Sequence, residues 1–183
     1  MKNDGGEKRA LEKAALKTFL SLYNRNHPIK YRLLYFQEKP DAVIQDARGN
    51  KLGVEITHCF YDSHEARRVL GRQHKVREEE EHAWETLDTL IAELNKLIRR
   101  KEEKKAHYVD HYPIALLIRN ASLSFGMSDI LKYREMLCKP GGAFTHVWFL
   151  SRDGTKDWLL TDLCEPKQAE PAGSADDSQT TGS

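Results

Sequence analysis

Two acidic residues in the first half of the sequence are placed to meet on neighbouring strands. Asp41 opens one extended segment, and Glu55 lies within the next, residues 53–59. Because side chains alternate between the two faces of a strand, the apolar Val54 and Ile56 predict a core face and leave Glu55 on the opposite face. A hairpin between the two segments would roughly align Asp41 with the far half of the Glu55 strand. Two carboxylates that converge from one side suit a hard, oxygen-seeking cation such as Mg²⁺ or Mn²⁺.

The pattern of apolar and turn residues predicts the elements that position this pair. They are a first helix at about 7–23, strands at 31–37, 42–46 and 52–60, a long helical region at about 63–107, a strand at 113–119, a helix at 129–138 capped by Ser128, and strands at 145–150 and 158–163. Three strands so close in sequence most simply form an antiparallel meander. The whole order predicts an α/β fold with a mixed central β-sheet flanked by helices.

Size and composition limit the class of protein. The 183 residues are enough for one domain with a real core, which we expect at residues 1–164. Residues 165–183 contain no large apolar side chain, so we expect a disordered tail that cannot offset its ordering entropy by burial. Neither a membrane-spanning apolar run nor a signal-peptide core is present, so we expect a cytoplasmic protein. Three cysteines without a CxxC pair do not indicate a zinc ribbon.

The acidic pair and the order of elements resemble the PD-(D/E)xK nuclease superfamily, which has the restriction-endonuclease-like fold. The matching residues are Pro40-Asp41, a turn, and then Glu55-Ile56-Thr57. The resemblance covers about residues 7–120, whose order helix-strand-strand-strand-helix-strand is similar to that family's core, with the last helix and two strands added. It implies hydrolysis of phosphodiester bonds in DNA with Mg²⁺ or Mn²⁺. Asp41 and Glu55 would be the catalytic metal ligands, and the Ile56 carbonyl and Glu12 on the first helix would be auxiliary ligands.

One position departs from the family pattern. Thr57 stands where the family usually has a lysine, and a threonine hydroxyl cannot supply that positive charge. In some members the basic residue lies on the following helix, which implies Lys75 as the catalytic cation here. The alternative is a catalytically inactive nuclease-like domain that binds nucleic acid or protein.

Local clusters of positive charge bear on the partner, because the net charge of the chain is only +1. We favour the cluster directly after the Glu55 strand as the DNA-binding surface: Arg67, Arg68, Arg72, Lys75 and Arg77. A second basic stretch, residues 96–105, could also contact phosphates, but we favour its interpretation as a helix end whose cations complement the helix dipole. Whether the nucleic acid is DNA or RNA, and whether two copies pair as a homodimer, stay open.

Overall fold

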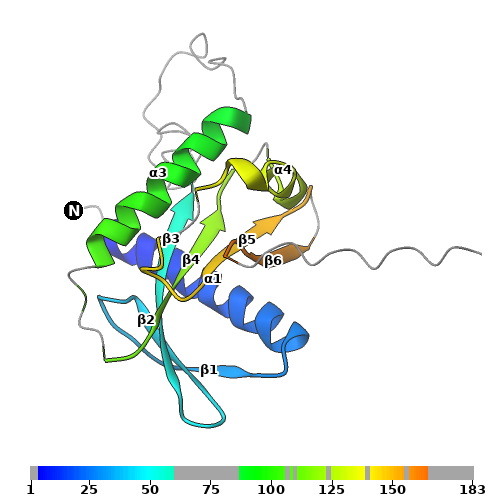
Figure 1. Cartoon of the computed structure of the whole chain (residues 1–183). Coiled ribbons are helices and arrows are strands. Elements are labelled where there is room, and N and C mark those ends of the chain that lie inside the picture. Colours follow the sequence, from blue (N-terminus) through cyan, green and yellow to red (C-terminus); the bar gives the residue numbers. More distant parts are fainter. Residues whose placement is uncertain are drawn as a thin grey trace, which may run out of the picture.

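The structure is a computed structural model that describes residues 4–59, 87–105, 108, 111–122, 125–138, 141–154 and 157–164 (Figure 1). Its elements in chain order are α1 (Asp4–Asn26), β1 (Tyr31–Phe36), β2 (Ala42–Asp46), β3 (Lys51–Cys59), α3 (Leu87–Lys105), β4 (Ile114–Asn120), α4 (Met127–Lys132), the 3₁₀ helix η2 (Arg134–Met136), β5 (Val147–Arg152) and β6 (Trp158–Asp162). The fold is therefore α/β, as predicted.

The six strands form one mixed sheet whose spatial order follows the sequence, β1 to β6. β1, β2 and β3 pair antiparallel, which confirms the predicted meander. β3, β4 and β5 then run parallel, and β6 returns antiparallel to β5. The change from antiparallel to parallel pairing occurs at β3, the strand that carries Glu55.

The helices cover both faces of the sheet, with α1 on one face and α3 and α4 on the other (Figure 1). The alternation of side chains along β3 explains this division. Val54 and Ile56 pack with Phe19 of α1 in one core. On the other face, Leu94 and Ile98 of α3 pack against strand residues of β4 and β5 in a second core. Each fully buried side chain of this size contributes about 1.5–3 kcal/mol to stability.

The predicted boundaries need correction at the last helix. It begins at Met127 rather than Asp129, and it ends at Lys132. The Gly126 amide donates to Asp129 Oδ2 at 2.8 Å, while the Ser128 hydroxyl bonds to Asp153 instead of capping the helix. The tight contact of Gly126 with the Asp153 segment decides where this helix starts.

Other expected segments lie partly outside the described residues. Of the predicted helical region at 63–107, α3 accounts for residues 87–105, and residues 60–86 are not described. The expected tail at 165–183 also lies outside the described residues. Within the part of the chain that the structure describes, each helix is too short or too polar to cross a membrane.

Candidate active site

The β2–β3 hairpin places Asp41 next to Glu55. Ala42 pairs with Val54 in the antiparallel register, so Asp41, one residue earlier, lies across from Glu55, one residue later. Glu55 shares its strand face with Gly53, and its register partner Leu116 belongs to the core under α3. Glu55 therefore points toward α3, the face opposite Val54 and Ile56, as the alternation predicts.

A close approach between Gly53 and Pro40 holds the start of β2 against β3. A Cβ atom at Gly53 would lie 2.6 Å from Pro40 Cγ and 3.0 Å from a ring carbon of Tyr112. Atoms in folded proteins do not approach this closely, so a larger residue would push the Pro40-Asp41 segment away. Gly53 is thus required by space, and it fixes the position of the Asp41 carboxylate.

Asp41 carries a carboxylate whose charge is unfavourable in its surroundings. Its Oδ2 accepts a hydrogen bond from the Ile56 amide at 2.7 Å. Burial and the nearby charge of Glu55 nevertheless raise the pKa of Asp41 to about 7, and the charge of Glu12 adds to this. A buried carboxylate whose pKa is raised by a second nearby carboxylate is a place where a cation binds favourably.

Glu55 is buried, with 6% of the residue exposed. Its Oε1 accepts a hydrogen bond from Lys101 Nζ of α3 at 2.7 Å, which makes a largely buried ion pair. Its Oε2 is also buried, and it has no hydrogen-bond partner among the described residues. A buried carboxylate oxygen without a partner is costly, so Oε2 is the atom at which a further ligand would be accommodated.

Lys101 is the cationic residue that sequence reasoning did not place in the site. It lies three residues after Ile98 and four after Leu97, which are both buried, so it falls in the apolar stripe of α3. The position of a lysine within this otherwise buried stripe was the sequence signal that its side chain points toward the sheet. It was missed because the basic stretch 96–105 was interpreted as one helix end. Thr57 lies on the same face of β3 as Glu55 but carries no charge. The positive charge next to Glu55 comes from Lys101 of α3.

The other residues implied by the resemblance separate into two groups. Glu12 of α1 is buried and pairs with Lys8 at 3.2 Å, and its charge acts on Asp41. Lys8 in turn has a raised pKa, first because of its hydrogen bond with Glu12 and further because of Asp41 and Glu55. Lys75 and the predicted basic cluster at residues 67–77 lie outside the described residues.

Tyr108 is a further neighbour that the sequence did not single out. Burial, and then the charge of Glu55, raise the pKa of its hydroxyl. Its hydroxyl therefore stays protonated at neutral pH and can donate a hydrogen bond near the carboxylates.

No protein-family model, curated protein or solved structure matches this chain.

The donor set fits a hard divalent cation better than zinc. Within the described residues, no group of three or more His, Cys, Asp or Glu side chains is arranged to hold a metal ion. Asp41 and Glu55 supply two carboxylates, and one Glu55 oxygen lacks a partner among these residues. The Ile56 carbonyl points to the same strand edge as its amide, which faces Asp41. Mg²⁺ usually keeps several waters and is bound through one or two protein carboxylates, so Asp41 and Glu55 are the residues that could hold it.

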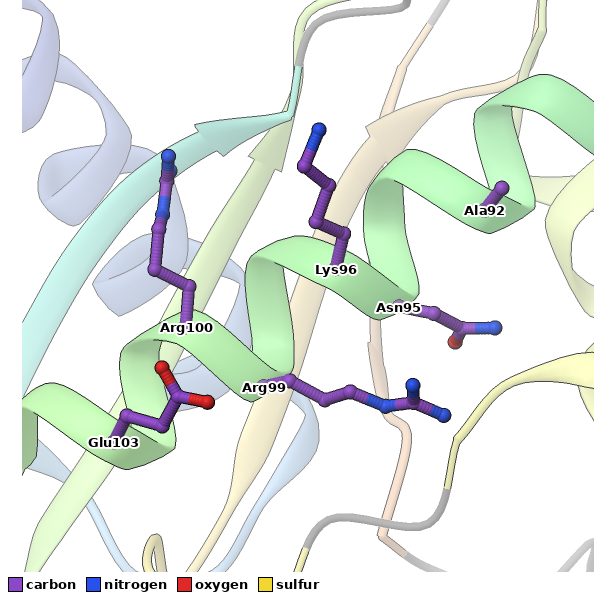
Figure 2. Close-up of a pocket in the computed structure, with 6 residues that line it drawn as sticks. All are labelled: Ala92, Asn95, Lys96, Arg99, Arg100 and Glu103. Atoms are coloured by element: carbon purple, nitrogen blue, oxygen red, sulfur yellow. The ribbon is translucent and has the colours of Figure 1, made fainter.

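The exposed side of α3 carries further positive charge, where Lys96 forms an ion pair with Glu93 at 3.4 Å. A shallow hollow of about 500 Å³ lies along the helix, and Figure 2 shows Lys96 and Arg100 pointing the same way, apart from Asn95 and Arg99. Asn95 bonds to the segment after α4, at the Met136 carbonyl and the Cys138 amide. Lys96 and Arg100 therefore lie on the flank of α3 away from that segment. We call these two residues the basic flank of α3.

Proposed function

We propose that this chain is a magnesium-dependent nuclease that hydrolyses phosphodiester bonds in DNA. The observation that carries the proposal is the convergence of Asp41 and Glu55 with Lys101, which contacts Glu55 at 2.7 Å. A pair of carboxylates with an adjacent ammonium group is the combination that binds a divalent cation and a phosphate together.

The topology supports a restriction-endonuclease-like core. One helix is followed by three antiparallel strands, a helix and a strand parallel to the third, in the order α1, β1, β2, β3, α3 and β4. In this arrangement the two acidic residues lie at the start of the second strand and within the third, as in the PD-(D/E)xK pattern. α4, β5 and β6 are additions to this core.

Each residue of the site has a proposed task. Asp41, Glu55 and the Ile56 carbonyl would hold Mg²⁺, with Glu12 as an auxiliary acidic group. When bound, the metal ion activates water and neutralises charge on the scissile phosphate. Lys101 replaces the missing lysine at Thr57, because its ammonium group lies beside the carboxylates and stabilises negative charge that builds on the phosphate. The basic flank of α3 would guide the nucleic-acid backbone toward this point.

Cleavage assays with each carboxylate removed test the proposal. Supercoiled DNA, linear DNA and RNA are incubated with Mg²⁺ or Mn²⁺ and the wild type, Asp41→Ala, Glu55→Ala, or the exposed control Glu38→Ala. We expect the first two variants to lose activity by at least about 100-fold, since they lack a metal ligand, and Glu38→Ala to match the wild type. Cleavage that survives in both Asp41→Ala and Glu55→Ala would exclude this site as the catalytic centre.

A second candidate function is binding without catalysis, and the Lys101–Glu55 ion pair favours it. Lys101 already compensates one oxygen of Glu55 without any metal, and Thr57 leaves the strand itself without a cation. Titration with Mn²⁺ in a calorimeter separates the two functions. A nuclease binds Mn²⁺ in a manner that needs Asp41 and Glu55, whereas a binding module shows no such metal site.

A further inference from the structure

A second cluster of positive charge lies on the α1 side of the sheet. Arg119 lies on the same face of β4 as Ala115 and Leu117, which belong to the core under α1. Arg152 of β5 is the register partner of Trp158 in β6. Both guanidinium groups lie over the Trp158 ring, at 5.1 Å from the ring centre for Arg119 and 4.9 Å for Arg152. Three consecutive strands thus bring two arginines to one aromatic side chain.

The charge of Arg119 is poorly compensated. Its Nη1 atom is buried and has no hydrogen-bond partner among the described residues. Burial, and then the charge of Arg152, lower the pKa of Arg119. Buried charges in proteins are normally paired, and two neighbouring guanidinium groups repel each other. The stacking on Trp158 offsets part of this cost, but it leaves a hydrogen-bond donor without an acceptor.

An anion with several oxygen acceptors would complement this pair of guanidinium groups. A guanidinium group presents a planar set of hydrogen-bond donors that matches the oxygen atoms of a phosphate group. Stacking on Trp158 orients both guanidinium groups in the absence of a ligand. Arg152 is exposed and Arg119 is half-buried, so the pair can be reached from solvent on the Arg152 side.

We propose that Arg119 and Arg152 bind a phosphate group of a nucleic-acid strand, on the sheet face opposite the one that carries Glu55. This inference rests on the proposed function, because it takes the strand from that function.

Nucleic-acid binding in EDTA tests the proposal without any cleavage. The full chain is titrated with labelled single-stranded and duplex oligonucleotides, each with a 5′-phosphate or a 5′-hydroxyl end, over a range of salt concentrations. The variants are Arg119→Met and Arg152→Met, which keep an unbranched side chain, and Arg25→Met as a control at the exposed end of α1. We expect each of the first two to weaken binding about 3–10-fold at low salt. Because both guanidinium groups contact one phosphate, we expect each variant to reduce the salt slope by no more than about 0.7–0.9, the value for that whole phosphate.

The outcomes separate the possible ligands. Weaker binding of a variant to both 5′-phosphate and 5′-hydroxyl oligonucleotides indicates that the site binds an internal phosphate. Weaker binding only to 5′-phosphorylated oligonucleotides indicates a terminal phosphate. Either result supports the proposal. Wild-type affinity and slope in both variants would show a structural stack and overturn it. Inorganic phosphate at fixed ionic strength is the third arm. If it raises the Tm of the wild type but not of Arg119→Met, while oligonucleotide binding is unchanged, the ligand is free phosphate and the proposal is also overturned.

Two controls keep the result interpretable. Circular dichroism and Tm establish that each variant is folded, and because Arg152 is exposed, Arg152→Met carries the test if Arg119→Met is unstable. Asp41→Ala is titrated in parallel. If DNA cleavage fails to depend on Asp41 while the arginine variants still weaken binding, the proposed function fails and the phosphate site stands. If cleavage depends on Asp41 and the arginine variants bind normally, the proposed function stands and the phosphate site fails.

Discussion

Lys101 and Glu55 depend on each other because both side chains are largely buried, with 15% and 8% of their side-chain surface exposed. Removing one partner of such a pair leaves the other charge in a poorly solvated position. The same ammonium group is the one that we assign to the phosphate. One residue therefore has a structural and a chemical task, and these can be separated by substitution.

Lys101→Met is expected to reduce DNA cleavage by about 10²–10³-fold and to lower the free energy of unfolding by about 3–5 kcal/mol. The double variant Lys101→Met, Glu55→Gln should recover most of the stability and none of the activity, since no charge is then left uncompensated. Urea denaturation and single-turnover cleavage measure the two effects. Lys104→Met, on the exposed side of the same helix, is the control and should change neither. Full activity in Lys101→Met would assign the catalytic cation elsewhere.

Asp41 predicts a specific pH dependence for the metal-free protein. Burial and the charge of Glu55 raise its folded-state pKa to about 7, whereas an unfolded chain has the ordinary value of about 3.9. Between these values the folded state binds more protons than the unfolded state, so the free energy of unfolding falls as pH rises from about 4 to about 7. Asp41→Asn removes this contribution. We expect the stability of the wild type relative to Asp41→Asn to decline through that window, measured by urea denaturation in EDTA. A difference that is constant or grows with pH would contradict the raised pKa.

At the scale of elements, the β2–β3 hairpin depends on the absence of a side chain at Gly53. A methyl group there would overlap Pro40, which directly precedes Asp41. The position of the carboxylate and the packing of the hairpin are therefore coupled through this one close approach.

Gly53→Ala is expected to lower the free energy of unfolding by about 1–3 kcal/mol, the usual cost of overpacking, and to reduce cleavage because Asp41 moves relative to Glu55. Gly141→Ala is the matched control, since a Cβ there would meet only the Glu102 side chain at ordinary van der Waals distances of 3.5 Å and more. Thermal unfolding and Mn²⁺ titration measure the two consequences. If Gly53→Ala binds Mn²⁺ and unfolds like the wild type, the close approach is not what positions Asp41.

At the scale of the whole molecule, positive charge forms local clusters although the net charge is only +1. α3 contributes Lys101 to the carboxylate site through its ion pair with Glu55. The same helix carries Lys96 and Arg100 of the basic flank at its surface (Figure 2). Such local clustering is sufficient for salt-dependent attraction to a nucleic-acid backbone.

The double variant Lys96→Gln, Arg100→Gln is expected to weaken DNA binding at low salt and to reduce the salt slope by up to about 1.8, which is about 0.9 for each phosphate that is no longer neutralised. The cleavage rate at saturating DNA should change little, because neither residue contacts the carboxylates. Arg48→Gln, in the exposed turn between β2 and β3, is the control and should bind like the wild type. Fluorescence anisotropy over a salt series gives the slopes. An unchanged salt slope in the double variant would show that the DNA backbone binds to another surface of the protein.

Local patterns in the sequence determined the order of the elements and the carboxylate pair. Period-two alternation assigned Val54 and Ile56 to the core and Glu55 to the other face, and a hairpin connection needs only neighbouring segments. The mixed α/β class followed from the same patterns. These features depend on residues close together in the chain, where spacing alone defines which face a side chain occupies.

Only the tertiary structure decided which cation meets the carboxylates and how the arginines gather. Lys101 is 46 residues from Glu55, and its ion pair depends on how α3 packs across the sheet. Arg119, Arg152 and Trp158 are likewise joined by strand order and register. A sequence shows that a lysine lies within an apolar stripe, but it does not show what that stripe faces. The facing residue is set by packing between elements that are distant in the chain.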